Sequence, residues 1–373
     1  MNKLKVLTAI FVLMFTGIGC WDVRDVTNRA FVTAIGLDAA EEGFKVTLLI
    51  PRPANIKNIS SQIYSVHETE EAESISKAVS LLQSKLSRDI SFGHLRAVVI
   101  GEKLARQSNF NDLLSYIGKN PEVAFRHRLF FVEGREARDV LATIPFLNRA
   151  LTSELVGLAG SGEHLGVVRT KRFFDFLGDL RQTNGNALGA RMVMKNNNGR
   201  AELSRIGGAI FTNWRLAGWL NPDEMRDANW LLKENPNIVV VTKLGKGQYS
   251  CLINKKSVKI KPLVDDNGQL KFAVNIKAVG NISEQLGTSL DLTEPQNMQK
   301  VEAAIKKTVY QQASKAVQKS QQEVGSDYLG FDRALINNEP ELYANRNWPE
   351  VYPTIPVEIK VELRIPTVGI ERR

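Results

Sequence analysis

The stretch FVTAIGLDAAEEGFKVTLLIPRP, residues 31–53, predicts a β-hairpin at the start of the folded part of the chain. Residues 31–37 and 44–50 are rich in β-branched and apolar side chains, which favour strands. The acidic, glycine-containing segment 41–43 between them predicts a turn, and the two prolines that follow end the second strand. The fold therefore begins with two antiparallel strands.

The residues after this hairpin predict an alternation of helices and strands. In EAESISKAVSLLQSKLS, residues 71–87, apolar side chains recur at helical spacing. These side chains are Ala72, Ile75, Val79, Leu82 and Leu86. Residues 94–102 (HLRAVVIGE) predict a strand, residues 110–117 a helix, and residues 125–134 (FRHRLFFVEG) another strand before a short helix at 136–141. Such alternation is typical of an α/β architecture with a mixed sheet.

The middle of the chain has a weaker pattern. Residues 145–168 are rich in glycine and predict loops and short helices, whereas residues 171–180 predict a helix. LGARMVMK (188–195) and RIGGAIF (205–211) predict two strands around the Asn- and Gly-rich turn at 196–199.

The second half is denser in strands. A helix capped by Asn221 precedes three predicted strands in NIVVVTK, YSCLINKKSVKIKP and QLKFAVNIKAVG. DDNG at 265–268 joins the last two strands and predicts a hairpin turn, although paired acids can also bind a metal. Residues 294–324 predict the longest helix, and PTIPVEIKVELRI (353–365) a final strand.

These patterns predict an α/β (α+β) protein with several domains, mixed sheets flanked by helices, and a strand-rich second half. We expect an N-terminal α/β region at 20–195, which can divide into two subdomains, and a C-terminal α/β domain at 196–373 that contains the long helix. Residues 1–19 are predicted to be a signal peptide.

The signal peptide is predicted from the pattern of the first residues. Lys3 and Lys5 precede an apolar stretch from Leu7 to Ile18, which is shorter than the roughly 20 residues of a membrane span. The small residue Gly19 stands at the expected cut, and Cys20 follows it, as in a lipoprotein signal.

In that pathway diacylglycerol alkylates the thiol of Cys20, the peptide is cut before it, and the new amine can be acylated with a fatty acid such as palmitate. A thiolate suits this step because it is a strong nucleophile. Thr16 replaces the usual leucine of the motif. The alternative is an ordinary signal peptide that ends near a cysteine.

Composition limits the possible functions. The chain has 373 residues, of which 43% are hydrophobic, and a net charge of +9. A modestly basic surface favours anionic lipid headgroups, whereas secretion and the lack of five consecutive basic residues argue against nucleic acid. The second of the two cysteines, Cys251, lies in an alternating apolar pattern and predicts a buried thiol.

No constellation for catalysis is visible. The four histidines are widely separated, so none forms a zinc-binding pair at helical spacing. LAGSGEH at 158–164 lacks the first and last glycines of a serine nucleophile elbow. We therefore expect no enzyme activity, no metal and no cofactor. We expect the tryptophans at 214, 219 and 348 to lie in the core. The alternative is that they are exposed and anchor an interface with a partner.

Several short motifs stand in a specific order along the chain. They are Gly-Cys-Trp-Asp at 19–22 followed by FVTAIGLD, then FGHLRAVVIGEKLA, RIGGAIF with WRLAGWL, and SDYLGF after the long helix, with Trp348 beyond it. In this order they resemble one known family, the Ger(x)C spore germination lipoproteins, which are C subunits of nutrient germinant receptors in spore-forming Firmicutes. The resemblance covers nearly the whole chain, and only the end TVGIERR departs from it.

This resemblance implies a multidomain α/β protein on the outer face of the spore inner membrane. It implies two integral membrane partners, the A and B subunits, and a complex that responds to small nutrients and triggers germination. It implies no catalytic residues. The alternatives are a solute-binding lipoprotein of an importer, which would have two similar lobes, and a cell-wall hydrolase, which would need paired acids or a metal site.

Overall fold

The computed structural model describes most of the chain from Val26 to Pro366. The described residues are 26–52, 65–107, 110–123, 126–146, 150–164, 166–168, 170–183, 185–197, 200–204, 207–233, 237–288 and 290–366. The predicted signal peptide at 1–19 and the predicted lipidation site Cys20 lie outside these residues.

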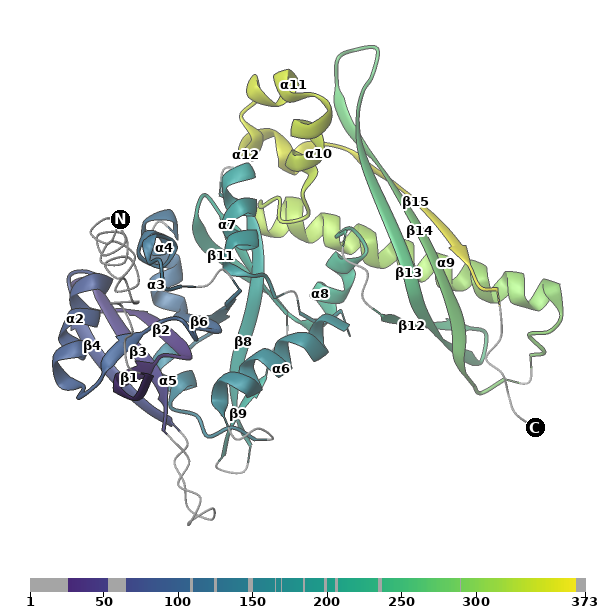
Figure 1. Cartoon of the computed structure of the whole chain (residues 1–373). Coiled ribbons are helices and arrows are strands. Elements are labelled where there is room, and N and C mark those ends of the chain that lie inside the picture. The colour runs from purple at the N-terminus through teal and green to yellow at the C-terminus, as the bar shows by residue number, and fades with distance from the viewer. Residues whose placement is uncertain are drawn as a thin grey trace, which may run out of the picture.

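A nine-stranded mixed sheet organises the first part of the molecule (Figure 1). Its strands run in the order β11-β10-β8-β7-β6-β2-β3-β4, and β9 pairs with β8. The bounds are β2 Ala34–Ala39, β3 Phe44–Pro51, β4 Ser65–Ala72, β6 Ala97–Gly101, β7 Arg128–Val132, β8 Ala187–Asn197, β9 Arg200–Ser204, β10 Gly208–Thr212 and β11 Arg215–Leu220. A short parallel pair, β1 (Arg29–Phe31) and β5 (Asp89–Ser91), stands beside it.

The predicted hairpin is confirmed. Strands β2 and β3 are antiparallel, from Ala34 opposite Leu49 to Ala39 opposite Phe44. Gly43 closes the turn with a φ of 90°, a left-handed conformation that glycine adopts without a steric penalty. In the middle of the sheet three successive pairs are parallel, β2 with β6, β6 with β7, and β7 with β8.

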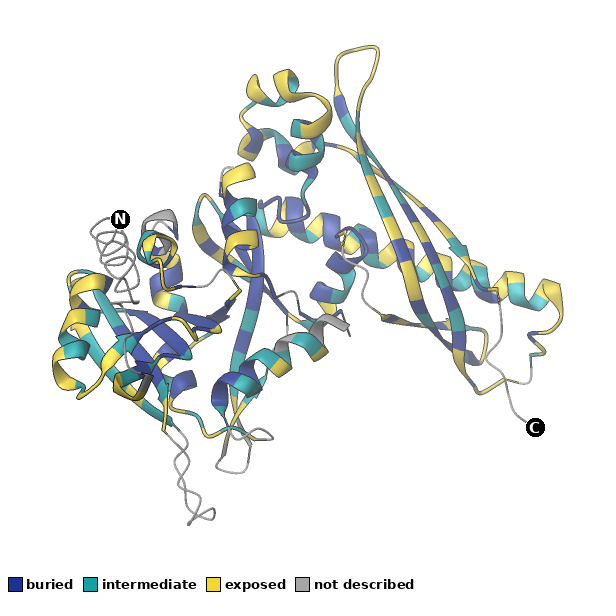
Figure 2. Cartoon of the chain, viewed as in Figure 1, coloured by how far each residue is buried: buried dark blue, intermediate teal, exposed yellow. Residues whose placement is uncertain are grey.

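Helices cover both faces of this sheet, as buried parallel strands require. On one face lie α2 Ile75–Lys85, α3 Glu102–Gln107, α4 Phe110–Lys119 and α7 Phe173–Gln182. On the other face lie α5 Ala137–Leu141 and α6 Leu151–His164. Figure 2 shows the central strands as continuously buried, and every residue of β6 is buried.

Two predictions for the middle of the chain were wrong. Residues 145–168 contain the 14-residue helix α6 rather than short helices and loops. Leu151 and Leu155 are buried one helical turn apart, so packing against the sheet outweighs the low helix propensity of the glycines. The predicted two strands around the 196–199 turn are in fact three, because β9 lies between β8 and β10.

A four-stranded sheet organises the second part, in the order β12-β13-β14-β15. Its strands are β12 Ile238–Leu244, β13 Gly247–Val264, β14 Leu270–Leu286 and β15 Val357–Arg364. The predicted long helix is confirmed as α9, Pro295–Gln318, which continues as π-helical turns at Lys319–Val324. Four shorter helices are α8 Pro222–Asn229, α10 Phe331–Asn338, α11 Pro340–Ala344 and α12 Trp348–Val351.

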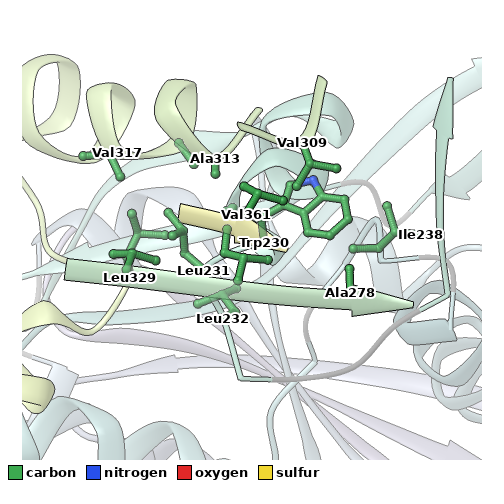
Figure 3. Packing of buried hydrophobic residues seen from close by; sticks show 14 of the residues in the cluster. Trp230, Leu231, Leu232, Ile238, Ala278, Val309, Ala313, Val317, Leu329 and Val361 are labelled. Atoms are coloured by element: carbon green, nitrogen blue, oxygen red, sulfur yellow. The ribbon is translucent and has the colours of Figure 1, made fainter. Parts of the chain in front are cut away.

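Helix α9 covers only one face of this sheet. Its side chains Val309, Ala313 and Val317 point into a core that also holds Ala278 of β14 and Val361 of β15 (Figure 3). On β12, buried and exposed residues alternate, and the outward-facing valines are about half exposed. The mixed α/β fold class is confirmed, with sheets that differ in how they are covered.

The two sheets share packing near residue 200. Strands β10 and β11 lie beyond the predicted boundary at 195/196 but belong to the nine-stranded sheet. Leu188 and Ile210 of that sheet are part of the same hydrophobic cluster as α9. The division into regions 20–195 and 196–373 stays a prediction.

Candidate functional site

A cavity of about 420 Å³ lies between the nine-stranded sheet and the second part of the molecule. One wall comes from α7 and the start of β8, and the other from residues 231–233, β13 and α10. We call this place the junction. Its charged lining residues are Lys171, Asp179, Lys233, Lys259, Lys261, Asp327 and Arg333.

Asp179 is the centre of an ion-pair cluster in the junction. Its Oδ1 atom accepts a hydrogen bond of 2.7 Å from Nη2 of Arg333 on α10. Its Oδ2 atom pairs with the ammonium of Lys171. The Asp179 side chain is only 14% exposed, so the carboxylate has given up most of its hydration for these two cations.

Asp327 holds the start of α10. Its Oδ1 accepts backbone N–H bonds from Gly330 (2.9 Å) and Phe331 (3.1 Å), and its Oδ2 accepts one from Asp332 (2.6 Å). These bonds satisfy amide groups at the helix N-terminus that have no partner within the helix. The local sequence SDYLGF folds this way because Gly330 adopts a φ of 88°, which favours glycine.

Asp332 lies next to Asp327 and is completely buried. Burial raises the pKa of both carboxyls, and repulsion from Asp327 raises the pKa of Asp332 further. Asp332 is therefore the one of the two that keeps its proton to higher pH. Its Oδ2 accepts a 3.4 Å hydrogen bond from the side-chain amide of Asn186, which precedes β8.

Polar contacts join the two parts of the molecule at the junction. The ion pair between Arg333 and Asp179 and the hydrogen bond from the Asn186 side-chain amide to Asp332 both run between residues 179–186 and residues 332–333. The Ser326 hydroxyl also donates a 3.2 Å hydrogen bond to the carbonyl oxygen of Phe211 on β10. These contacts hold residues 326–333 against α7 and the nine-stranded sheet. Among the described residues, no group of three His, Cys, Asp or Glu side chains could hold a metal ion.

Other residues singled out in the sequence lie apart from the junction. Cys251 is buried in β13, and burial raises the pKa of its thiol to about 11, so it is an inert core residue. The tryptophan at 348 is buried, as predicted, while those at 214 and 219 are half-buried at the edge of a core. His127 is buried with its ring 4.8 Å from that of Phe173.

None of the helices in the described ranges is both long enough and apolar enough to cross a membrane.

Comparisons with known families cover almost all of the chain. The family model described as "Spore germination protein N-terminal domain" matches residues 22–192. The one described as "Spore germination B3/GerAC like, C-terminal" matches residues 206–369. The chain belongs to the GerAC-like family of spore germination proteins. This is a family of germination receptor C subunits.

Relatives of the GerAC-like family match end to end. Spore germination protein KC of Bacillus subtilis (strain 168) is 24% identical and is aligned over 98% of this chain and 96% of its own length. Spore germination protein B3 of the same organism is 22% identical over 99% of both chains. The crystal structure of the GerBC protein covers 93% of this chain with a TM-score of 0.59 at 18% identity, so the fold is shared.

Sequence reasoning missed the junction in this GerAC-like chain. The motif SDYLGF carried the resemblance, and its Asp327 bonds to amides close by in the sequence, but the partner of Asp332, Asn186, lies 146 residues away. The available signal was two acids at 327 and 332 that flank a glycine within an apolar segment, a pattern typical of a capped helix start. Nothing local could reveal that α7 and Asn186 supply the other half.

Proposed function

We propose that this chain is the lipid-anchored subunit of a spore nutrient germinant receptor. It acts with integral membrane A and B subunits on the outer face of the spore inner membrane, and its diacylglyceryl anchor is at Cys20. The observation that carries the anchor is Cys20 itself, directly after a short apolar stretch and a small residue. Membership in the GerAC-like family supports the receptor context.

A diacylglyceryl group is sufficient for such a tether. One acyl chain gives only marginal membrane residence, whereas two chains, at about 0.8 kcal/mol per buried methylene, give stable anchoring. Cys20 lies before the first described strand, so the folded region is free to lie on the membrane surface beside its partners. In this proposal the subunit is not an enzyme. It contributes contacts and positioning.

Radioactive palmitate labelling in the sporulating host tests the anchor, with the two cysteines as a matched pair. Cys20→Ala should abolish labelling and move the protein out of the membrane fraction, while Cys251→Ala should keep both. The nutrient response through this receptor should fall in Cys20→Ala spores. Equal labelling of wild type and Cys20→Ala would overturn the anchor assignment.

Co-purification tests the partners. Wild-type protein tagged at its C-terminus and extracted from the spore inner membrane should recover two multi-span proteins. An importer would recover an ATPase and its permease instead. The importer alternative predicts two similar lobes, but the nine-stranded and four-stranded sheets differ in strand number, order and covering.

A further inference from the structure

The first described residues border a second hollow, of about 600 Å³, on the nine-stranded region. Its walls come from β1, the end of β3, Val66 of β4 and the residues just after α2. The apolar part is formed by side chains such as Phe31, Ile50 and Leu86. We call this place the arginine pocket. β1 is the darkest purple strand in Figure 1.

Arg29, Arg52 and Arg88 are the charged residues of the pocket lining, and no acid is among them. Arg52 and Arg88 are exposed, and Arg29 is half-buried. No ion pair joins any of the three to an acid within the described part of the chain. Within the described residues, Asp89 follows Arg88 and stands opposite Arg29 in the β1–β5 register. The pocket therefore has an excess of positive charge around an apolar floor.

This combination fits one kind of ligand. Guanidinium groups bind phosphate oxygens through two parallel hydrogen bonds, and they do so better than ammonium groups. An apolar floor next to the guanidinium groups would accept the glycerol and the first methylenes of an acyl chain. An anionic phospholipid carries both features in one molecule.

The position of the pocket supports the same ligand. Thr27 lines the pocket, and only a short segment separates it from Cys20. At no more than about 3.6 Å per residue, the chain between them spans about 25 Å at most. An anchor at Cys20 thus holds the arginine pocket within that distance of the lipid headgroups.

We infer that the arginine pocket binds the phosphate headgroup of an anionic phospholipid, and that this second contact fixes the orientation of the tethered domain on the membrane. The inference rests on the proposed anchor for its geometry. A flexible tether alone would leave the domain free to tumble. A second contact on the same side turns one face of the nine-stranded sheet toward the bilayer.

Vesicle sedimentation tests this inference with a protein that carries no lipid anchor. The protein is the mature chain proposed above, residues 20–373, carrying Cys20→Ala. The vesicles contain 30% phosphatidylglycerol in phosphatidylcholine, or phosphatidylcholine alone. A basic residue near an anionic surface contributes about fivefold in binding, so the triple variant Arg29→Gln, Arg52→Gln, Arg88→Gln should lose about 100-fold.

A matched control removes the same charge elsewhere. Lys300, Lys306 and Lys307 are exposed on α9, and replacing all three with Gln should leave phosphatidylglycerol binding within about threefold of the Cys20→Ala parent. The single change Arg52→Glu, at an exposed residue outside any strand, should lose at least about tenfold and guards against misfolding of the triple variant. Phosphatidylcholine vesicles should bind none of the variants.

The possible results distinguish a failure of this inference from a failure of the proposed anchor. Equal losses in the arginine and lysine variants would mean that only net charge matters, and would overturn it. Binding abolished by millimolar inorganic phosphate at constant ionic strength would assign the pocket to free phosphate instead of lipid. Loss of partner recovery with unchanged vesicle binding would assign it to a protein contact. If palmitate labelling shows no acylation of Cys20, arginine-dependent vesicle binding would still support the pocket.

Discussion

The two sheets of this molecule bury their strands in different ways. In the nine-stranded sheet, β6 is buried along its whole length between helices on both faces. In the four-stranded sheet, β12 alternates between buried and exposed residues, because α9 covers one face only. A strand between two helical layers has no solvent-facing side chains, whereas a strand under one layer keeps half of them in water.

This difference separates the buried strands that determine stability from the open sheet face that is available for contact with partners. Side chains in the central strands of the nine-stranded sheet, such as β6, are constrained from both faces, so nearly any change in their volume should lower stability. The open face of the four-stranded sheet offers exposed side chains that can be changed at little cost to folding. The substitutions below test this contrast, from the largest expected effect to the smallest.

Phe131→Ala should be the most damaging. Phe131 is completely buried in β7, and its ring centroid lies 4.7 to 5.5 Å from those of Phe110, Phe176 and Phe211. Removing a buried aromatic ring costs roughly 3–5 kcal/mol in the free energy of unfolding. Urea unfolding would measure this loss in the free energy of unfolding. Amide hydrogen exchange would show whether the strands of this sheet open more often. A loss below 1 kcal/mol would mean that the aromatic cluster does not hold this sheet together.

Asp38, at the end of β2, should give the nine-stranded sheet a dependence on pH. Burial raises its pKa to about 6, repulsion from Glu136 adds to this, and backbone N–H bonds from Ala137 and Arg138 and the charge of Lys45 oppose it. The folded protein thus keeps a proton that the unfolded chain, with a pKa of 3.8, has lost. Its contribution to stability is complete below pH 4 and lost as pH rises through 6, by about 3 kcal/mol.

Asp38→Asn should remove this fall, because an amide does not titrate. The measurement is the free energy of unfolding of variant and wild type between pH 4 and 8, compared point by point. Glu358→Gln on the open face is the control, since this exposed carboxylate pairs with Lys271 at the surface and its loss should leave the slope unchanged. An identical slope in Asp38→Asn and wild type would contradict the burial argument.

Asp179→Asn tests how firmly the junction couples the two sheets. The change leaves both Lys171 and Arg333 facing a neutral amide, which should cost about 2 kcal/mol. We expect the two parts to unfold in more separate steps, as seen by comparing fluorescence with circular dichroism. Glu362→Gln, which weakens exposed ion pairs on β15, should change stability by less than about 0.5 kcal/mol. Coincident transitions in Asp179→Asn would show that the ion pair does not couple them.

Val240 and Val241 give the smallest and most direct comparison, because these neighbours on β12 point to opposite faces. Val240 is fully buried and Val241 is 49% exposed. Val240→Thr buries a hydroxyl and should cost roughly 1–2 kcal/mol, whereas Val241→Thr keeps the β-branched shape and should stay within about 0.5 kcal/mol. Thermal unfolding of the two single variants decides. A similar loss of stability in both variants would mean that side chains on the open face pack against other residues of this chain, without any partner.

Local sequence patterns were sufficient to predict the elements whose signals, such as periodicity, turns and caps, lie in adjacent residues. The β2–β3 hairpin, the α9 helix and the Asn221-capped helix α8 with its capping box were all visible from periodicity and caps. Helix α6 was not, because its stability comes from burying Leu151 and Leu155 against distant strands. Strand β9 was not predicted, because it has only five residues and begins soon after β8 ends.

The candidate site was even less accessible to sequence reasoning. The junction joins Asp179 to Arg333 and Asn186 to Asp332, which are about 150 residues apart. The arginine pocket collects three arginines that are scattered between residues 29 and 88. No spacing rule links such positions, since only the crossing of chain segments in the fold brings them together. The lipidation site at Cys20, whose signal lies in adjacent residues, stays a prediction.

Strand β15 protects an edge of the four-stranded sheet. It pairs in parallel with β14, from Phe272 opposite Val357 to Val279 opposite Arg364. Without β15, β14 would have a free row of amide and carbonyl groups along these eight residues. A chain that lacked β15 would offer that row to another copy, and such edges promote aggregation. Strand β15 thus keeps two copies of the chain apart by occupying the edge at which they could pair.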